Sequence, residues 1–173
     1  MSKVISGAAT LAVLFCVAAF GNLLPNSGLT EGDKTPAGWS LSGGQGEWIR
    51  DRGDGMGCLK VSGGGEDSNA WLSSPVELLP NRVYRLTFGA RGEDTSGGTV
   101  VSGPVFANVD IGVPGREWAF HHNVFAAPSR KEGLAVPVRL GQWHLKGSAF
   151  FVRPRLEEVE PVHRGIGGLL LGE

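Results

Sequence analysis

The sequence predicts an all-β protein: a two-sheet antiparallel jelly-roll sandwich of about eight strands, preceded by a signal peptide. Three observations indicate this fold class. The 173 residues include 28 glycines and 10 prolines, a composition typical of short strands joined by turns. Short apolar segments recur between clusters of Gly, Pro, Asn and Ser, as in sandwiches. No segment shows a sustained helical period.

The first segment has the composition of an export leader. Lys3 precedes the apolar run VISGAATLAVLFCVAAF, and small residues at Ala19 and Gly21 mark a signal peptidase site. We therefore expect residues 1–21 to be removed and the mature chain to be secreted, periplasmic or held at the cell surface, without membrane contact. An uncleaved anchor is the alternative, although the run is slightly short for a membrane span.

Charge and cysteine content narrow the range of partners and chemistry. The 16 Lys and Arg residues nearly balance 17 Asp and Glu residues, so no nucleic acid partner is expected. Removal of the leader leaves Cys58 as the one cysteine of the mature chain, which rules out an internal disulfide or a cysteine-based zinc site. Stability must therefore come from the hydrophobic core.

Residues 22–160 form the predicted sandwich domain. Its strands are expected within GWSLSG, GEWIRD, CLKVSG, AWLSSPVEL, VYRLTFGAR, GTVVSGPVFANVDIGV, WAFHHNVFA, AVPVRLGQWHL and AFFVRPRLEEVEPV. In VYRLTFGAR the apolar side chains alternate with Arg85, Thr87 and Arg91, the period of a half-buried strand. Residues 161–173 are expected to be a tail or the start of a further segment, which would make the chain part of a longer polypeptide.

The stretch RLGQWHL, residues 139–145, is the strongest candidate for a binding surface. Val136, Val138 and Leu140 share one face of the predicted strand. This places Arg139 and Trp143 on the opposite face. Gln142 and His144 continue the core parity, unless a bulge at Gly141 exchanges the faces of the residues that follow. One large aromatic ring is thus expected outside the core, beside hydrogen-bonding groups.

The segment WAFHHNVFA offers further polar candidates. Alternation places Trp118 and Phe120 on the predicted core face, with His121 and Asn123 on the surface. Trp39 is also predicted to lie in the core. Since His121 and His122 are adjacent on a strand, they point to opposite faces, so a histidine metal site is not favoured. No paired carboxylates, nucleophile elbow or phosphate-binding loop marks a catalytic centre.

Aromatic rings beside hydrogen-bonding side chains are suited to sugars, whose apolar C–H faces stack on indoles and whose hydroxyls bind polar groups. The candidate carbohydrate-binding residues are Trp143, Arg139, Gln142, His144, His121, Asn123, Arg91 and Trp48. No catalytic residue is assigned. The expected partner is a glycan or polysaccharide.

The order of segments resembles a known family. The sequences NLLPNSGLTEGDKTPAGWSLSG, LKVSG, SSPVELLPNRVYRLTFGARG, EWAFHHNVFAAP and FFVRPRLEEV are together similar to the CenC-type carbohydrate-binding modules of the galactose-binding-like β-sandwich superfamily. The resemblance covers roughly residues 22–160. It implies a jelly-roll sandwich, secretion and non-catalytic glycan binding, commonly as an accessory domain of a larger extracellular protein.

Many of these relatives hold a structural calcium ion, a cation that takes oxygen ligands. The resemblance implies Asn26 and Glu31 as calcium ligands. Val152 and Arg153 occupy the positions of the usual Asp pair, so half of the ligand set is missing. No other cofactor is expected. Two other functions stay open: a structural or protein-interaction module of a larger cell-envelope or extracellular protein, with Trp143 as an interface anchor, and a glycoside hydrolase or lyase.

Overall fold

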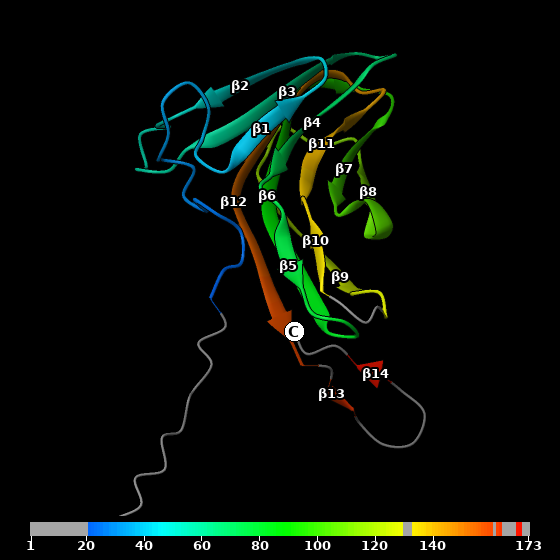
Figure 1. Ribbon diagram of the computed structural model, residues 1–173. Coiled ribbons are helices and arrows are strands. Elements are labelled where there is room, and N and C mark those ends of the chain that lie inside the picture. Colours follow the sequence, from blue (N-terminus) through cyan, green and yellow to red (C-terminus); the bar gives the residue numbers. More distant parts are fainter. Residues whose placement is uncertain (1–20, 130–132, 161, 164–168, 171–173) are drawn as a thin grey trace, which may run out of the picture.

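The computed structural model describes residues 21–129, 133–160, 162–163 and 169–170. Two five-stranded antiparallel sheets pack face to face, which confirms the predicted two-sheet β-sandwich (Figure 1). The predicted signal peptide lies outside the described residues, apart from Gly21, and stays a prediction. Of residues 161–173, the structure describes the paired strands β13 (Val162–His163) and β14 (Leu169–Leu170).

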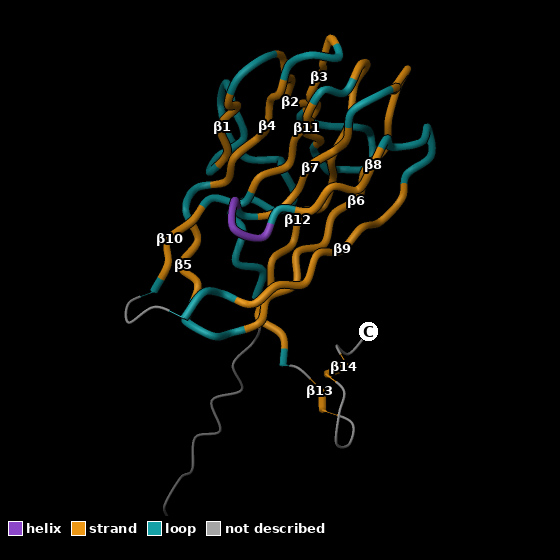
Figure 2. Tube along the Cα trace, turned by 90° about the vertical axis from the view of Figure 1, so that its right-hand side faces the viewer, coloured by secondary structure: helices purple, strands orange, loops and turns teal. Residues whose placement is uncertain are grey.

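The first sheet has the order β1, β4, β11, β7, β8. Its strands are β1 (Trp39–Ser42), β4 (Ser68–Ser73), β11 (Arg139–Trp143), β7 (Thr99–Gly103) and β8 (Val109–Gly112). Figure 2 faces this sheet, with β1 on the left and β8 on the right. The short 3-10 helix η1 (Val105–Ala107) connects β7 to β8.

The second sheet has the order β2, β3, β12, β6, β9. Its strands are β2 (Gln45–Ile49), β3 (Cys58–Gly64), β12 (Lys146–Val159), β6 (Val83–Ser96) and β9 (Ala119–Ala126). A separate two-stranded sheet joins β5 (Val76–Leu78) to β10 (Leu134–Val136).

The structure has more strands than the predicted eight, and part of the excess arises because prolines divide predicted segments. AWLSSPVEL becomes β4 and β5, with Pro75 between them, and AVPVRLGQWHL becomes β10 and β11, separated at Pro137. Proline has no backbone N–H and so cannot donate to a strand ladder. These breaks separate the short β5–β10 ribbon from the first sheet.

The core lies between the two sheets and consists mainly of aliphatic and aromatic side chains. The largest fully buried apolar ones are Tyr84, Phe88, Phe151, Leu29, Leu59, Leu78, Leu86, Leu140, Leu145 and Leu156. The predicted burial of Trp39 is confirmed, and its indole Nε1–H donates to the Pro25 carbonyl oxygen at 3.1 Å. The alternation predicted for β6 is also confirmed, because its apolar set faces this core.

The predicted faces of β9 are wrong. Leu86 and Phe88 of β6 face the core, and their register partners are Asn123 and His121. Because paired residues share a face of a sheet, these polar residues point inward, while Trp118 and Phe120 point outward and are 37% and 67% exposed. The hydrophobic pattern is misleading here because β9 is an edge strand with aromatic residues on its outer face.

No helix within the described part of the chain has the length and apolar character needed to cross a membrane.

Candidate functional site

A groove of about 590 Å³ lies on the outer face of the first sheet. The centre of its floor is a row of small side chains, because the register places Ala70 of β4, Gly141 of β11 and Val101 of β7 side by side. A Cβ atom added at Gly141 would lie 2.4 Å from the Cβ of Ala70. The flat floor therefore depends on glycine at this position.

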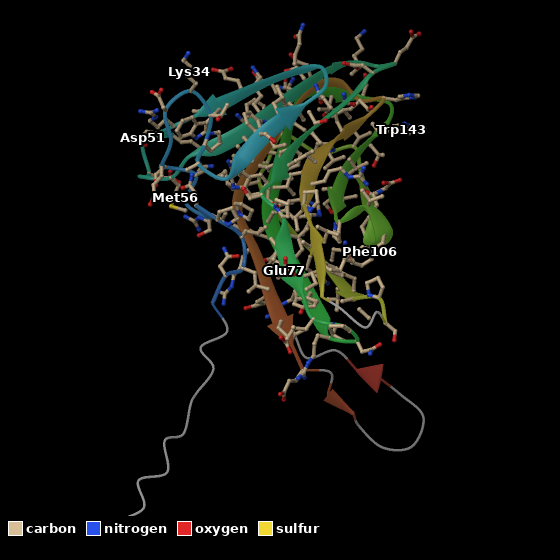
Figure 3. All side chains as sticks on the ribbon, viewed as in Figure 1. Lys34, Asp51, Met56, Glu77, Phe106 and Trp143 are labelled. Atoms are coloured by element: carbon tan, nitrogen blue, oxygen red, sulfur yellow. The ribbon has the colours of Figure 1, made fainter. Side chains whose placement is uncertain are left out.

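Trp143 stands at one end of the floor. Its side chain is 52% exposed and lines the groove, and Figure 3 shows it projecting at the edge of the molecule, beyond the end of β11. The imidazole of His144 stacks on the indole, with 4.0 Å between ring centroids and 13° between planes. One indole face is thus covered, and the opposite face is left for a ligand.

Arg139 stands at the other end of the floor, four residues from Trp143 and on the same face of β11, a separation of about 13 Å. Its guanidinium donates to Oδ1 of Asn108 at 2.7 Å, and Nδ2 of Asn108 donates to Oδ1 of Asp110 at 2.9 Å. This chain of hydrogen bonds orients the guanidinium and leaves the second carboxylate oxygen of Asp110 without a partner among the described side chains. The groove therefore offers both donors and acceptors.

The predicted exposure of Trp143 is confirmed, and the unbroken register of β11 with both neighbours shows no bulge at Gly141. Gln142 accordingly points into the sandwich and is 1% exposed. Its Oε1 accepts a hydrogen bond from the backbone N–H of Leu145 at 2.8 Å. From the inner side of the sheet, Gln142 thus stabilises the turn that follows Trp143.

His144 occupies this turn with a φ of 54°, and its backbone N–H donates to the carbonyl oxygen of Asp67 at 2.8 Å. Because of this left-handed conformation, the alternation of side chains between the two faces of the sheet ends at Trp143. As a result, the imidazole points to the surface and packs on the indole instead of continuing the core face.

The other four candidate residues lie away from the groove. His121 and Asn123 face the sandwich interior on β9, so the predicted surface position of both is wrong: Asn123 donates to the carbonyl oxygen of Ala107 at 2.9 Å, and His121 stacks on Phe88 with 5.7 Å between ring centroids. Burial lowers the pKa of the His121 imidazole, and the nearby charge of His122 adds to this effect.

Trp48 and Arg91 belong to the second sheet. Trp48 is half-buried against the core, and its Nε1–H donates to the Leu29 carbonyl oxygen at 2.7 Å. Arg91 lies on the outer face of that sheet, with its guanidinium carbon 4.1 Å from the Phe150 ring centroid. Neither residue shares the groove with Trp143, because both lie on the opposite sheet. The sheet to which a strand belongs is set by long-range pairing, which local alternation does not reveal.

Asp110 was not considered as a site residue from the sequence, and Asn108 counted only as one of several hydrogen-bonding side chains suited to sugars. The sequence signal for both residues is the i, i+2 spacing in NVD, in extended backbone that leads into β8, which places both side chains on one face. Nothing local indicates that this face adjoins Arg139. That neighbourhood depends on the pairing of β7 with both β8 and β11.

The side-chain amide of Asn26 is already used within its own loop. Its Oδ1 accepts hydrogen bonds from the backbone N–H groups of Thr30 and Glu31 at 3.1 and 3.2 Å, while Nδ2 donates to the Glu31 carbonyl oxygen. An oxygen that faces two N–H donors is poorly placed to bind a cation, so the side chain of Asn26 does not fit the role of a calcium ligand. Among the described residues, no three His, Cys, Asp or Glu side chains form a metal cluster.

Sequence comparison finds no matching family model and no matching curated protein. The fold, by contrast, is similar to solved carbohydrate-binding modules. A CBM4 module aligns over 78% of this chain and 99% of its own length, at 12% identity and a TM-score of 0.57. TmCBM61, solved with β-1,4-galactotriose, aligns over 79% and 98%, at 19% identity and 0.54.

The CBM22-1 xylan-binding domain of Paenibacillus barcinonensis Xyn10C aligns over 82% of this chain and 97% of its own, at 15% identity and a TM-score of 0.54. Two larger proteins contain a similar unit. This chain spans 26% of the arabinose-bound MgGH51 α-L-arabinofuranosidase, at 13% identity and a TM-score of 0.62, and 21% of the bacteriophage CBA120 tailspike protein 4 domain. These likenesses show that the chain has the β-sandwich fold of carbohydrate-binding modules.

Proposed function

We propose that the protein is an exported, non-catalytic carbohydrate-binding module that holds a neutral glycan in the groove of the first sheet. A sugar ring stacks on the free face of Trp143, and its neighbours extend over the small residues of the floor toward Arg139. The single observation that carries this proposal is the exposed Trp143 at one end of a flat floor with an oriented polar chain at the other end.

The lining supports a neutral ligand. Arg139 and Asp110 are the one cation and the one carboxylate among the described residues that line the groove, so their charges offset each other. Sugar hydroxyls both donate and accept hydrogen bonds, which suits a guanidinium and a carboxylate oxygen held within one groove. The volume is also in the range of small-ligand sites.

The same lining favours binding over hydrolysis. Glycoside hydrolysis typically uses two carboxyl groups on either side of the scissile bond, whereas the described lining provides Asp110 alone. The fold comparison adds support, since three similar structures are carbohydrate-binding modules or domains that align over nearly their full length. We propose further that residues 1–21 direct export to the periplasm, the cell surface or the medium, and that the chain acts as an accessory unit of a larger protein.

Affinity electrophoresis in gels that contain xylan, galactan, mixed-linkage β-glucan or no polysaccharide tests this function. Covering one indole face removes on the order of 80 Å² of apolar surface from water, which at about 25 cal/mol/Å² is about 2 kcal/mol, or about thirty-fold in affinity. Trp143→Ala is therefore expected to abolish the retardation of the wild type. Phe120→Ala removes an exposed aromatic ring from the second sheet, outside both grooves, and is the matched control.

Retardation in at least one gel, lost in Trp143→Ala and kept in Phe120→Ala, is the expected result. A wild type that migrates freely through every polysaccharide, or a Trp143→Ala variant that is retarded as strongly as the wild type, would overturn the proposal.

A further inference from the structure

A second groove, of about 490 Å³, opens on the outer face of the second sheet, away from Trp143. The loop that contains Arg52 forms one wall, and Arg91, Trp118 and Phe150 form the rest of the aromatic and cationic lining. Strand register explains the grouping: Arg91 of β6 pairs with Phe150 of β12, and Trp118 immediately precedes β9, the other neighbour of β6. The site is therefore assembled by strands of the second sheet, the loop that contains Arg52 and the segment that leads into β9.

Arg91 is the central cation of this groove. Its guanidinium carbon lies 4.1 Å from the Phe150 ring centroid and 5.4 Å from that of Trp118. Within the described residues it forms no ion pair and no side-chain hydrogen bond. Stacking on the rings fixes the guanidinium plane, so its N–H donors are held in position at the groove without a carboxylate to neutralise them.

Arg52 adds a second guanidinium, whose carbon lies 4.9 Å from the Trp118 ring centroid. It forms an ion pair with Asp54, and its buried Nε has no hydrogen-bond partner among the described residues. Two guanidiniums thus meet a single carboxylate in the lining. This excess of positive charge distinguishes the second groove from the first, where the charges balance.

We propose that this second groove binds a carboxylate-bearing sugar, a hexuronate unit. The fork of Arg91 matches the two oxygens of a carboxylate, and the 37% exposed indole of Trp118 offers a surface for the C–H face of the same ring. A flat carboxylate-bearing ring satisfies both features at once. The inference concerns a site on the opposite sheet and stands whether or not the first groove binds glycans.

The test follows the indole Nε1–H signal of Trp118 in ¹H–¹⁵N spectra of the protein, identified by its loss in Trp118→Phe. Sodium glucuronate is added at constant ionic strength, with glucose and N-acetylglycine as separate probes. We expect a saturable shift with glucuronate, no shift with glucose, and a weaker response to N-acetylglycine, which carries a carboxylate on a peptide-like group without a sugar ring.

Three variants locate the binding. Arg91→Gln removes the fork and is expected to weaken glucuronate at least tenfold, and Arg91→Lys, which keeps the charge, is also expected to weaken it. Arg116→Gln removes an exposed arginine outside the groove, paired with Asp94 at 3.3 Å, and is expected to leave affinity unchanged. Trp143→Ala is expected to leave the affinity for glucuronate unchanged, so the result does not depend on whether the first groove binds glycans.

An equal response to glucose, unchanged affinity in both Arg91 variants, or tighter binding of N-acetylglycine than of glucuronate would overturn the inference. The last outcome would indicate a site for peptide carboxylates instead.

Discussion

Replacement of Gly141 by alanine is expected to destabilise the first sheet at the floor of the groove. The new Cβ would lie 2.4 Å from both the Ala70 Cβ and the Asn69 carbonyl oxygen, whereas carbon contacts are optimal at about 3.5–4.0 Å. Neither atom is at the end of a flexible side chain, so β4 and β11 must separate by about 1 Å. Overpacking of this kind costs about 1–3 kcal/mol.

In a chain of this size, such a loss lowers Tm by roughly 2–4 °C per kcal/mol. Gly115→Ala is the matched control, because a Cβ at Gly115 meets no atom within 4 Å and its stability should change by less than about 0.5 kcal/mol. Urea unfolding and calorimetry of both variants provide the measurement. If Gly141→Ala unfolds at the same urea concentration as Gly115→Ala, the register that places Trp143 over the groove is refuted.

Three further predictions concern stability and reactivity. Tyr84→Phe removes the hydroxyl that accepts the Leu79 backbone N–H at 2.8 Å, so urea titration should show a loss of about 1 kcal/mol in the free energy of unfolding. Burial, and then the charge of His122, lowers the folded pKa of His121 below 6.5. The unfolded chain therefore binds more protons as pH falls below about 6.5; stability should drop between pH 7 and pH 5, and this drop should be smaller in His121→Gln. Burial raises the pKa of the Cys58 thiol to about 11, so iodoacetamide at pH 8 should modify it only after urea unfolding, measured by mass spectrometry with the other cysteine replaced by serine.

The fold class was predictable because it depends on properties that one sequence displays directly. Alternation in β6 assigned Tyr84 and Phe88 to the core correctly, since a strand buried on one face must repeat every two residues. Glycine and proline clusters located the turns. The strand count was less predictable, because the pattern does not tell whether a proline interrupts a strand, as Pro137 does, or lies outside it.

The candidate site was predictable only within β11. There the apolar parity placed Arg139 and Trp143 on the outer face, and the structure places them at the two ends of one groove. For β9 the same reasoning gave the wrong face, because the aromatic residues at Trp118 and Phe120 are outside the core. The register with β6 decides the face of an edge strand, and register is a long-range property.

Asn108 illustrates the same limit. It precedes β8, whereas Arg139 begins β11, and the intervening strand β7 brings them to 2.7 Å. Segments far apart in the sequence therefore build the polar end of the groove. Residue types alone identified side chains that are suited to sugar binding. The structure divides these side chains between the two outer faces of the sandwich, one with a charge-balanced groove and the other with a cationic groove.

Glycan binding on the outer face of the first sheet, at Trp143, is the basis of the proposed function. Its most direct test is a map of backbone and indole ¹H–¹⁵N shifts in the protein saturated with an oligosaccharide of the polysaccharide that retards it. We expect the largest shifts at the Trp143 indole and at the backbone amides of Ala70, Val101 and Gly141. Shifts confined to the second sheet, with the Trp143 indole unchanged, would contradict it.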